Sequence, residues 1–418
     1  MKKGAEILWE CLLREGVEVV FGYPGGANMP LYDAMLNYPI HHVLVRHEQG
    51  AAHMADGYAR ASGRVGVAMA TSGPGATNLV TGIATAMMDS VPVVFITGQV
   101  HAHLVGGDAF QEVDMTGITL PITKHNYLVM HADEIAEVVR EAFYIARSGR
   151  PGPVLIDICK NAQIEQTEFV YPEEVKLLGY QPVSHAPRNL LDEAVKLIEK
   201  AQKPVILCGH GVLMSKAEEE LMQFAVKTQT PVACTLLGLG AFPASHSLAL
   251  GMMGMHGEAY ANMAIQNSDL ILAFGMRFDD RVTGTLKTYA PKAKKIHVEI
   301  DPSELHKNVY ADVPLVGDLK TVLCDLIPLV DEYDHDEWLE QIGGWKNEVD
   351  SRSIMNWDDN GKLQVAHLVA DIWKATGGGA IVTTDVGQHQ MWAAQYYALE
   401  KPNRWITSGG AGTMGFGL

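Results

Sequence analysis

Short apolar runs alternate with helical stretches along the first 160 residues of the chain. The runs are rich in Val and Ile and contain few polar positions, which is typical of strands buried on both faces of a parallel sheet. Helical spacing fills most of the gaps between them, and residues 1–16 have the pattern of an amphipathic helix. We expect strands at residues 17–22, 43–46, 65–71, 91–97 and 153–158. The pattern therefore predicts a parallel sheet covered by helices.

Two irregular, acidic stretches interrupt this alternation. Residues 163–188 contain three prolines and a cluster of acids, and residues 331–362 are polar and acidic. A second α/β region lies between them, with apolar runs at 204–209, 231–235, 269–275 and 295–301. We predict a parallel α/β fold with domains at 1–165, 190–330 and 363–418, joined by linkers at 166–189 and 331–362. The third region holds too few elements to close a sheet, so we expect an incomplete domain there.

The composition narrows the function. The chain has 418 residues and a formal charge of -17, which argues against nucleic acids and membrane surfaces as partners. We find no signal peptide and no apolar run near the roughly 20 residues of a membrane span, so we expect a cytoplasmic protein. Its five cysteines show no CxxC spacing, and we interpret them as small core residues.

Glycine-rich turns follow five strand-like runs, including two in the third region at 380–384 and 404–406. Open α/β sheets bind ligands at strand ends, so five such turns together favour a binding function, although each alone is as often structural. The turns cover residues 22–28, 71–78, 208–212, 385–390 and 407–417. The last contains a GxGxxG pattern at 410–415, but the acid expected about 20 residues beyond a dinucleotide fingerprint does not follow it.

The sequence gives little support for a metal site, a serine nucleophile or a catalytic carboxylate pair. His101 and His103 form an HxH pair, and His41 and His42 are adjacent, but neither pair has a third ligand at metal-site spacing, so we predict no metal site in this sequence. No GxSxG nucleophile motif occurs. In RFDDR (277–281), the flanking arginines favour ion pairing or anion recognition over a catalytic carboxylate pair.

Glu48 stands where a strand-like run gives way to a helix of small residues. A single acid in this place has two explanations. It can be an N-terminal helix acid that faces the helix dipole. Alternatively, it works with a second titrating group that does not belong to the protein.

Ten motifs occur in an order that is similar to the catalytic subunits of the acetolactate synthase family, which depend on thiamine diphosphate. The similarity runs from about residue 4 to residue 418. The motifs are VFGYPGGA, RHEQGAAHMADGYAR, ATSGPGATNL, ITGQV, DAFQEVD, GRPGPVLIDI, GMHG, FGMRFDDRVTG, VGQHQMWAAQ and SGGAGTMGFG.

This resemblance implies a three-domain thiamine-diphosphate fold and a function in valine, leucine and isoleucine synthesis. Such enzymes decarboxylate pyruvate and join the hydroxyethyl unit to pyruvate or 2-oxobutanoate. Two alternatives stay open, which are an inactive FAD-binding fragment and another thiamine-diphosphate carboligase. A glyoxylate carboligase is disfavoured because that enzyme lacks the carboxylate found here as Glu48.

The resemblance also implies a first group of site residues. The carboxylate at Glu48 would hydrogen-bond N1′ of the aminopyrimidine, which a site shielded from water would favour. Pro24 and Gly25 are expected to bind the cofactor, and Pro74, Asn78 and Gln111 to line the pyrimidine side and the substrate channel. A wall from the partner subunit would grip the thiazolium and diphosphate, and its expected residues are Val386, Gly387, Gln388, His389, Gly412 and Met414.

The middle domain resembles one that binds a structural FAD. Its expected contacts are Arg150, Gly209, Gly211, Met255, His256, Gly275, Arg277, Glu299 and Asp318. By the same alignment, Arg281 would receive the carboxylate of the second 2-oxo acid, and Lys160 would lie at the mouth of the channel.

Departures from the family pattern matter as well. His101 and Cys159 replace prolines that the family usually has, and the first change puts herbicide sensitivity in doubt. The GDG motif and later asparagine that hold Mg²⁺ do not occur in the 418 residues, so we expect those ligands in a missing C-terminal segment. The resemblance further implies a homodimer or tetramer, with a possible small regulatory subunit.

Overall fold

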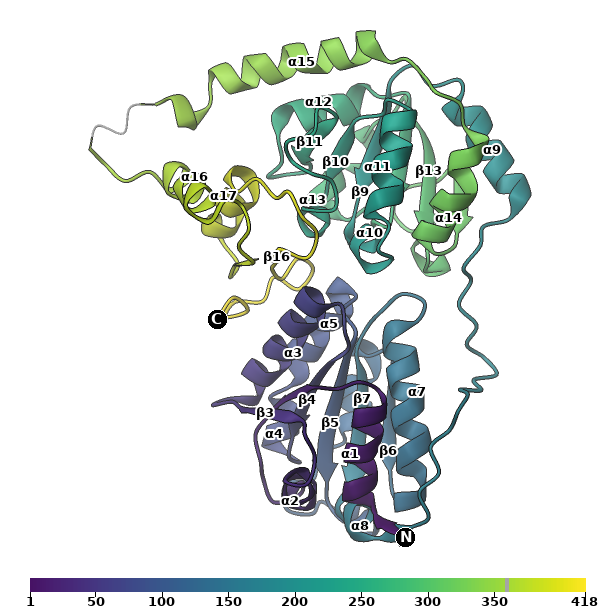
Figure 1. Ribbon diagram of the computed structural model, residues 1–418, viewed down its shortest axis with the longest axis vertical. Helices are drawn as coiled ribbons and strands as arrows, with labels where there is room; N and C mark the ends of the chain where they lie inside the picture. The colour runs from purple at the N-terminus through teal and green to yellow at the C-terminus, as the bar shows by residue number, and fades with distance from the viewer. Residues whose placement is uncertain (358–360) are drawn as a thin grey trace. The chain divides into compact units, whose positions relative to one another are not determined.

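The computed structural model describes residues 1–357 and 361–418, which form two compact units (Figure 1). The first unit comprises Met1–Gln181 and Ser408–Phe416. The second comprises Pro182–Thr407 and Gly417–Leu418. The segment 408–416 therefore packs with a part of the chain from which it is far removed in sequence.

The first unit is built on a six-stranded sheet in which all neighbouring strands are parallel. Since every strand runs the same way, the loops that follow the strands emerge at one edge of the sheet. In spatial order the strands are β3 (His41–Leu44), β2 (Val19–Gly22), β4 (Gly66–Ala70), β5 (Val93–Gln99), β7 (Val154–Cys159) and β6 (His125–Val129).

Each face of this sheet carries its own hydrophobic core, because successive side chains of a strand point to opposite faces. In β4, Val67 and Met69 belong to one core, whereas Ala68 and Ala70 belong to the other. The first core includes residues of α1 (Gly4–Arg14) and α7 (Ile135–Arg147), with α2 (Met29–Met35) and α8 (Lys160–Ile164) beside them. The second includes residues of α3 (Glu48–Ser62) and α5 (Val80–Asp89), and α6 (Met115–Thr119) packs beside α5.

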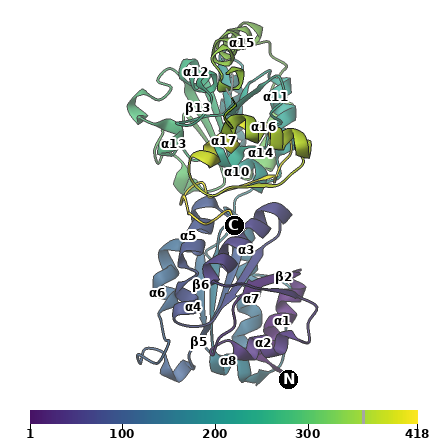
Figure 2. The same cartoon turned by 90° about the vertical axis from the view of Figure 1, so that its left-hand side faces the viewer.

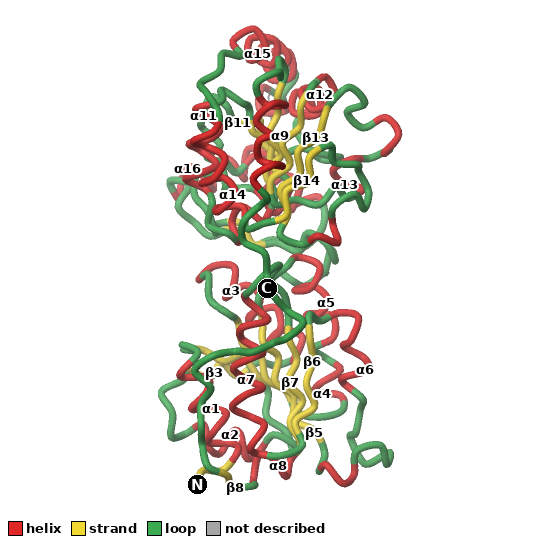
Figure 3. Tube along the Cα trace, turned by 90° about the vertical axis from the view of Figure 1, so that its right-hand side faces the viewer, coloured by secondary structure: helices red, strands yellow, loops and turns green. Residues whose placement is uncertain are grey.

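The second unit repeats this plan. Figures 2 and 3 show its strands side by side in a sheet, with helices on either side. All neighbouring strands are again parallel, in the order β11 (Ala249–Met252), β10 (Val232–Cys234), β9 (Pro204–Cys208), β12 (Leu270–Phe274), β13 (Lys294–Glu299) and β14 (Val313–Val316). Its helices include α9 (Arg188–Ile198), α10 (His210–Met214), α11 (Glu218–Lys227), α12 (Ala259–Asn267), α13 (Asp280–Thr283) and α14 (Leu319–Leu326).

The C-terminal part of the second unit contains α15 (Asp336–Ser351), α16 (Val365–Thr376), α17 (Gln388–Tyr396) and the short parallel pair β15 (Val382–Thr383) and β16 (Trp405–Ile406). Helix α15 lies within the stretch that we expect to be a linker. It is docked through Trp338, which is 2 % exposed and donates a hydrogen bond from its indole to the Pro204 carbonyl. An antiparallel pair, β1 (Lys2–Lys3) and β8 (Gln166–Thr167), lies in the first unit.

The predicted fold class of parallel sheets flanked by helices is confirmed. Strands β6, β11 and β14 and helix α15 were not predicted, and the strand expected at 43–46 lies two residues earlier. The cysteine prediction is wrong at one position, because Cys324 is exposed while the other four are buried. None of the described helices is long and apolar enough to span a bilayer.

A buried carboxylate joins two central strands of the first unit. Asp157 of β7 is 1 % exposed and accepts hydrogen bonds from Thr97 Oγ1 at 2.7 Å and Gln99 Nε2 at 2.9 Å. Burial raises the pKa of Asp157 from 3.8 to about 7, with a contribution from the charge of Asp114, and the two hydrogen bonds only partly oppose this. The same Gln99 amide donates to the Val113 carbonyl, which attaches the loop after β5 to the sheet.

The raised pKa predicts a pH-dependent stability of the first unit. Between pH 4 and 7 the folded state keeps the Asp157 proton that the unfolded chain has lost, so the free energy of unfolding falls as pH rises. The loss has an upper bound of about 4 kcal/mol. In Asp157→Asn, Oδ1 can still accept from Gln99 and the amide can donate to Thr97. We therefore expect the free energy of unfolding of the variant, relative to that of the wild type, to be higher at pH 8 than at pH 5.

The free energy of unfolding of both proteins is measured by urea unfolding at the two pH values. Amide exchange in β5 and β7 reports on the strands that Asp157 joins. A stability difference between the two proteins that is the same at pH 5 and pH 8 would contradict the assignment.

Candidate active site

Glu48 opens helix α3 at the edge of the sheet where the strands end. The helix begins here because His47 Nδ1 accepts a hydrogen bond from the Gln49 amide, and it ends at Gly63, whose φ is 69°. The Glu48 side chain is buried, with 9 % of the residue exposed. Its Oε2 accepts a hydrogen bond from Asn78 Nδ2 at 2.9 Å, and no described residue donates to Oε1. One carboxylate oxygen is thus held by the protein and the other is available.

Space beside that second oxygen depends on a glycine. A Cβ on Gly75 would stand 3.2 Å from Glu48 Oε1 and 2.8 Å from Thr71 Cγ2. A Cβ on Gly25 would meet the same methyl group at 2.4 Å, and the Thr71 hydroxyl accepts a hydrogen bond from the Ala27 amide. The loops after β2 and β4 therefore meet at Thr71, and they leave room next to the carboxylate.

Gln111 lies against the same loop. A Cβ on Gly73 would stand 3.0 Å from Gln111 Cα, and Gly73 has a φ of 60°, so only glycine fits this turn without strain. Gly73 immediately precedes Pro74, the first residue of the short helix α4 (Pro74–Thr77). Gln111 itself has a φ of 59° and is exposed. The structure thus brings together Pro24, Gly25, Glu48, Pro74, Asn78 and Gln111, all from loops or helix starts at the carboxyl edge of the sheet.

Burial and charge both affect Tyr32 near this group. Burial raises the pKa of the Tyr32 hydroxyl, and the Glu48 charge adds to the effect. The buried hydroxyl has no hydrogen-bond partner among the described residues. The neighbourhood of Glu48 is therefore shielded from water and contains an unsatisfied polar group.

Lys160 and Arg150 occupy opposite ends of β7. Lys160 begins α8 directly after the strand, so it shares the carboxyl edge with Glu48, and it is half-buried. Arg150 precedes the strand, and its Nε donates to Ser90 Oγ at 2.8 Å. The structure does not group Arg150 with the residues around Glu48.

In the second unit, three of the expected glycines touch one another. A Cβ on Gly209 would stand 2.3 Å from the Gly275 carbonyl oxygen, and a Cβ on Gly211 would stand 2.6 Å from Gly275 Cα. These glycines are required by the close packing of the loops after β9 and β12. Their presence has a structural reason whether or not a ligand binds there.

Met255 and Arg281 also lie side by side. The Met255 amide donates to the Arg281 carbonyl at 2.8 Å, and Arg281 Nη1 lies 3.3 Å from Met255 Sδ. The Arg281 side chain is exposed, with Nε 3.5 Å from Asp280. Arg277 is 3.7 Å from Asp279, which caps α13. The RFDDR acids are thus paired with its arginines and do not form a carboxylate dyad.

Glu299 and Asp318 accept hydrogen bonds from backbone amides of nearby residues. Glu299 Oε1 accepts from the amide of Ile300 at 2.9 Å, and Asp318 caps α14 by accepting from the Thr321 amide at 3.1 Å. Both stand at the carboxyl ends of their strands, as do Met255 and the loop glycines. His256 is attached through its carbonyl, which accepts a hydrogen bond from Gln395 Nε2 at 2.7 Å.

The residues expected to form the partner-subunit wall fall into two groups. Val386, Gly387, Gln388 and His389 lie at the start of α17 in the second unit, where the Gln388 and His389 side chains are exposed. Gly412 and Met414 lie in the segment 408–416 of the first unit, and Met414 is 78 % exposed. This segment is attached at Asp89, the last residue of α5.

Sequence reasoning missed Asp89 and its partner Arg60. Arg60 lies four residues after Asp56, a spacing that predicts an ion pair on one helix face, and that signal was available. The pairing of Arg60 with Asp89 joins two helices, and no local pattern indicates it.

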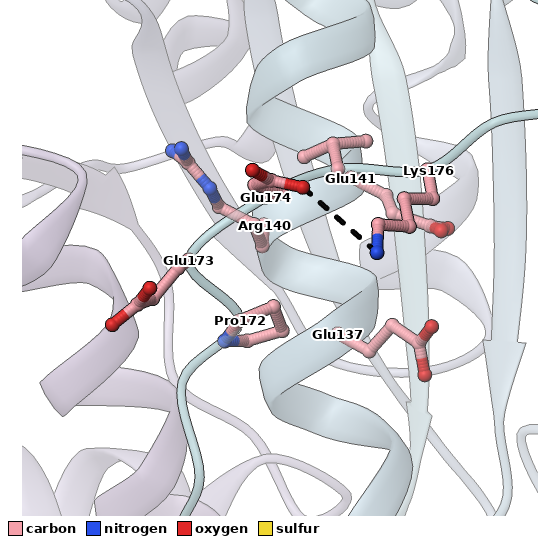
Figure 4. A pocket seen from close by; sticks show the side chains of 8 residues that line it. Glu137, Arg140, Glu141, Pro172, Glu173, Glu174 and Lys176 are labelled. Atoms are coloured by element: carbon pink, nitrogen blue, oxygen red, sulfur yellow. Dashed lines mark ion pairs between the residues drawn. The ribbon is translucent and has the colours of Figure 1, made fainter.

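Figure 4 shows a cavity of about 370 Å³ between α7 and the segment 172–176. It is polar and contains none of the expected site residues. Its lining consists of Glu137, Arg140, Glu141, Pro172, Glu173, Glu174, Val175 and Lys176. The rings of His101 and His103 lie 5.7 Å apart, and the described part of the chain holds no group of three or more His, Cys, Asp or Glu residues suited to a metal.

The chain matches three family models. The model described as "Thiamine pyrophosphate enzyme, N-terminal TPP binding domain" covers residues 2–118. The central-domain model of the same enzymes covers residues 191–326, and the C-terminal TPP-binding model covers residues 385–418. The residues around Glu48 thus fall mostly in the first match.

Similar proteins cover the chain almost completely. The acetolactate synthase isozyme 3 large subunit of Escherichia coli (strain K12) is 46 % identical over 425 residues, which are 100 % of this chain and 74 % of that protein. An acetolactate synthase of Mycobacterium bovis is 50 % identical, over 99 % of this chain and 68 % of its own length. A probable acetolactate synthase large subunit of Methanocaldococcus jannaschii is 48 % identical, over 100 % and 72 %. The chain therefore belongs to the family of the acetolactate synthase large subunits, within the thiamine pyrophosphate enzymes.

Proposed function

We propose that this chain is the catalytic subunit of a thiamine-diphosphate-dependent acetolactate synthase. It would convert two molecules of pyruvate to 2-acetolactate, or pyruvate and 2-oxobutanoate to 2-aceto-2-hydroxybutanoate. Relatives named as acetolactate synthase large subunits and the three thiamine pyrophosphate domain matches support this function. The observation that carries it is the buried Glu48, which has one oxygen bound to Asn78 and the other beside the gap left by Gly75.

The residues around Glu48 fit the aminopyrimidine of thiamine diphosphate. A flat ring needs an approach free of side chains, and Gly75 provides it, since a Cβ there would stand 3.2 Å from Glu48 Oε1. Glu48 would share a proton with ring nitrogen N1′, and Asn78 would hold the carboxylate in place through Oε2. Burial excludes competing water, which strengthens such a hydrogen bond. When bound, the cofactor supplies the carbanion chemistry, and the protein supplies orientation and proton control.

Further residues would line the substrate channel and bind the second substrate. Gln111, beside Gly73, would face the substrate channel, with Lys160 at the same edge of the sheet. In the second unit Arg281 would bind the carboxylate of the second 2-oxo acid, and its exposed guanidinium suits a planar anion. The domain boundaries at 1–165, 190–330 and 363–418 and the cytoplasmic location stay predictions.

FAD is proposed for the second unit. Gly209, Gly275, Glu299 and Asp318 come from four different loops to one edge of its parallel sheet. Open α/β sheets bind ligands at this edge. Among the described residues, no cluster fits Mg²⁺, so no step is assigned to that ion.

The homodimer is proposed from the resemblance to the acetolactate synthase family. Met414 and Gly412 of one chain would then complete the site of a second chain. A small regulatory subunit is proposed on the name "large subunit" that relatives carry.

Replacing Glu48 tests its role directly. In Glu48→Gln the side chain keeps its shape but no longer holds a proton for N1′. We expect exchange of the thiamine diphosphate C2 proton to slow by about 10²-fold or more. Exchange is measured by NMR after acid quenching of the protein–cofactor mixture in D₂O. The matched control is Glu18→Gln, since Glu18 pairs with Arg64 on the exposed surface. Equal exchange rates in the two variants would remove Glu48 from the mechanism.

The proposed activity is tested with the chain as it is. Pyruvate is added with thiamine diphosphate, Mg²⁺ and FAD in excess, and acetolactate is measured over time. We expect acetolactate in the wild type and a large loss in Glu48→Gln, while flavin retention is unchanged because Glu48 lies in the other unit. A folded wild-type protein that retains FAD and forms no acetolactate would contradict activity of this chain.

A further inference from the structure

The segment Ser408–Phe416 is bound to the first unit by a buried carboxylate. Asp89 is 2 % exposed, and it accepts hydrogen bonds from two successive backbone amides. The Gly409 amide donates to Oδ2 at 3.0 Å, and the Gly410 amide donates to Oδ1 at 2.7 Å. Both oxygens of one carboxylate thus fix the start of a segment about 320 residues away in sequence.

Further contacts continue along the segment. Thr413 and Thr85 of α5 share a hydrogen bond of 2.7 Å between their hydroxyl groups, and both are buried. The ring of Phe416 lies 5.3 Å from the guanidinium carbon of Arg60 and 5.3 Å from the ring of His53. The segment is therefore anchored at several points on α3 and α5.

Arg60 balances the charge of Asp89. Its Nη2 donates to Asp89 Oδ2 at 2.8 Å, and its Nε donates to Asp56 Oδ1 at 2.6 Å. Burial alone would lower the pKa of Arg60, but the two carboxylates raise it above its ordinary value. The guanidinium therefore stays charged, and it stabilises the carboxylate that holds the segment.

The same helices fix the distance from this anchor to Glu48. Helix α3 carries Glu48 at its first residue and Arg60 near its last. Helix α5, which ends at Asp89, packs closely on α3, because a Cβ on Gly82 would stand 2.2 Å from Ala52 Cβ. A rigid helix pair thus connects the candidate active-site carboxylate to the anchor of the segment.

We propose that Asp89 is a positioning residue: with Arg60 it holds the segment 408–416 so that Gly412 and Met414 are presented correctly to thiamine diphosphate. This rests on the proposed function, and it assigns a role to a buried ion pair that the mechanism does not otherwise use. Asp89 acts through the backbone of Gly409 and Gly410 and does not touch the cofactor.

The test is Asp89→Asn in the full chain. The variant keeps the size of the side chain and one acceptor oxygen, but the NH₂ group that replaces the other oxygen cannot accept from a backbone N–H. We expect amide hydrogen exchange at Gly409 and Gly410 to accelerate by about 10-fold or more, since a charge-assisted hydrogen bond is lost. The dissociation constant of thiamine diphosphate should rise by about 10-fold, measured by titration with Mg²⁺ present, while FAD retention stays the same.

Asp157→Asn is the matched control, because it removes another buried carboxylate of the same unit. Its exchange at residues 409 and 410 should equal that of the wild type. Unchanged exchange in a folded Asp89→Asn protein would overturn the proposal. Faster exchange with unchanged cofactor affinity would also overturn it, since Asp89 would then have only a structural role.

A second variant covers the case in which Asp89→Asn does not fold. Thr85→Val removes the hydroxyl contact with Thr413 and leaves the ion pair intact. We expect faster exchange across 409–416 and weaker cofactor binding in this variant too, and wild-type values for both would overturn the proposal. A wild-type chain that binds no thiamine diphosphate would refute the proposed function and the role towards the cofactor, and the exchange rates would still decide whether Asp89 holds the segment.

Discussion

Parallel pairing of every neighbouring strand in the two large sheets is the constraint on which the candidate sites depend. It forces each chain connection to cross a face of the sheet, which places helices on both faces and gives each unit two cores. It also brings all loops that follow strands to one edge. Glu48, Asn78 and Gln111, which are distant in sequence, can therefore share one neighbourhood only because β3, β4 and β5 run in the same direction.

Buried carboxylates are the second organising feature, and the first unit stabilises them in two ways. Asp157 has no cationic partner among the described residues, so hydrogen bonds from Thr97 and Gln99 support it while its pKa rises to about 7. Asp89 is instead paired with Arg60 and accepts hydrogen bonds from two backbone amides. The first arrangement ties two strands together, and the second ties a distant segment to two helices.

Local patterns in the sequence predicted the strands of the sheet centres and the loops that follow them. The runs that became β4, β5 and β7 are apolar because both of their faces are covered. Strand β6 was missed because it lies at the sheet edge, where His125 is exposed and polar residues are tolerated. Helix α15 was missed because most of its residues are polar. Only a few apolar positions, such as Trp338, pack against the rest of the unit. Contacts such as Asp89 with Gly410 depend on tertiary packing, which short-range patterns do not encode.

Glycine-rich turns illustrate why a motif needs its surroundings before it indicates a ligand. The turns at 71–78 and 208–212 are similar glycine-rich patterns in the sequence, yet their glycines have different neighbours in the structure. At Gly209 and Gly211, a side chain would collide with the backbone of Gly275, so packing of the protein itself requires glycine. At Gly75, the nearest polar atom is the free oxygen of Glu48, and a side chain would fill the space beside it. The second case is a stronger indication of binding, because no described residue donates to the carboxylate oxygen beside that space.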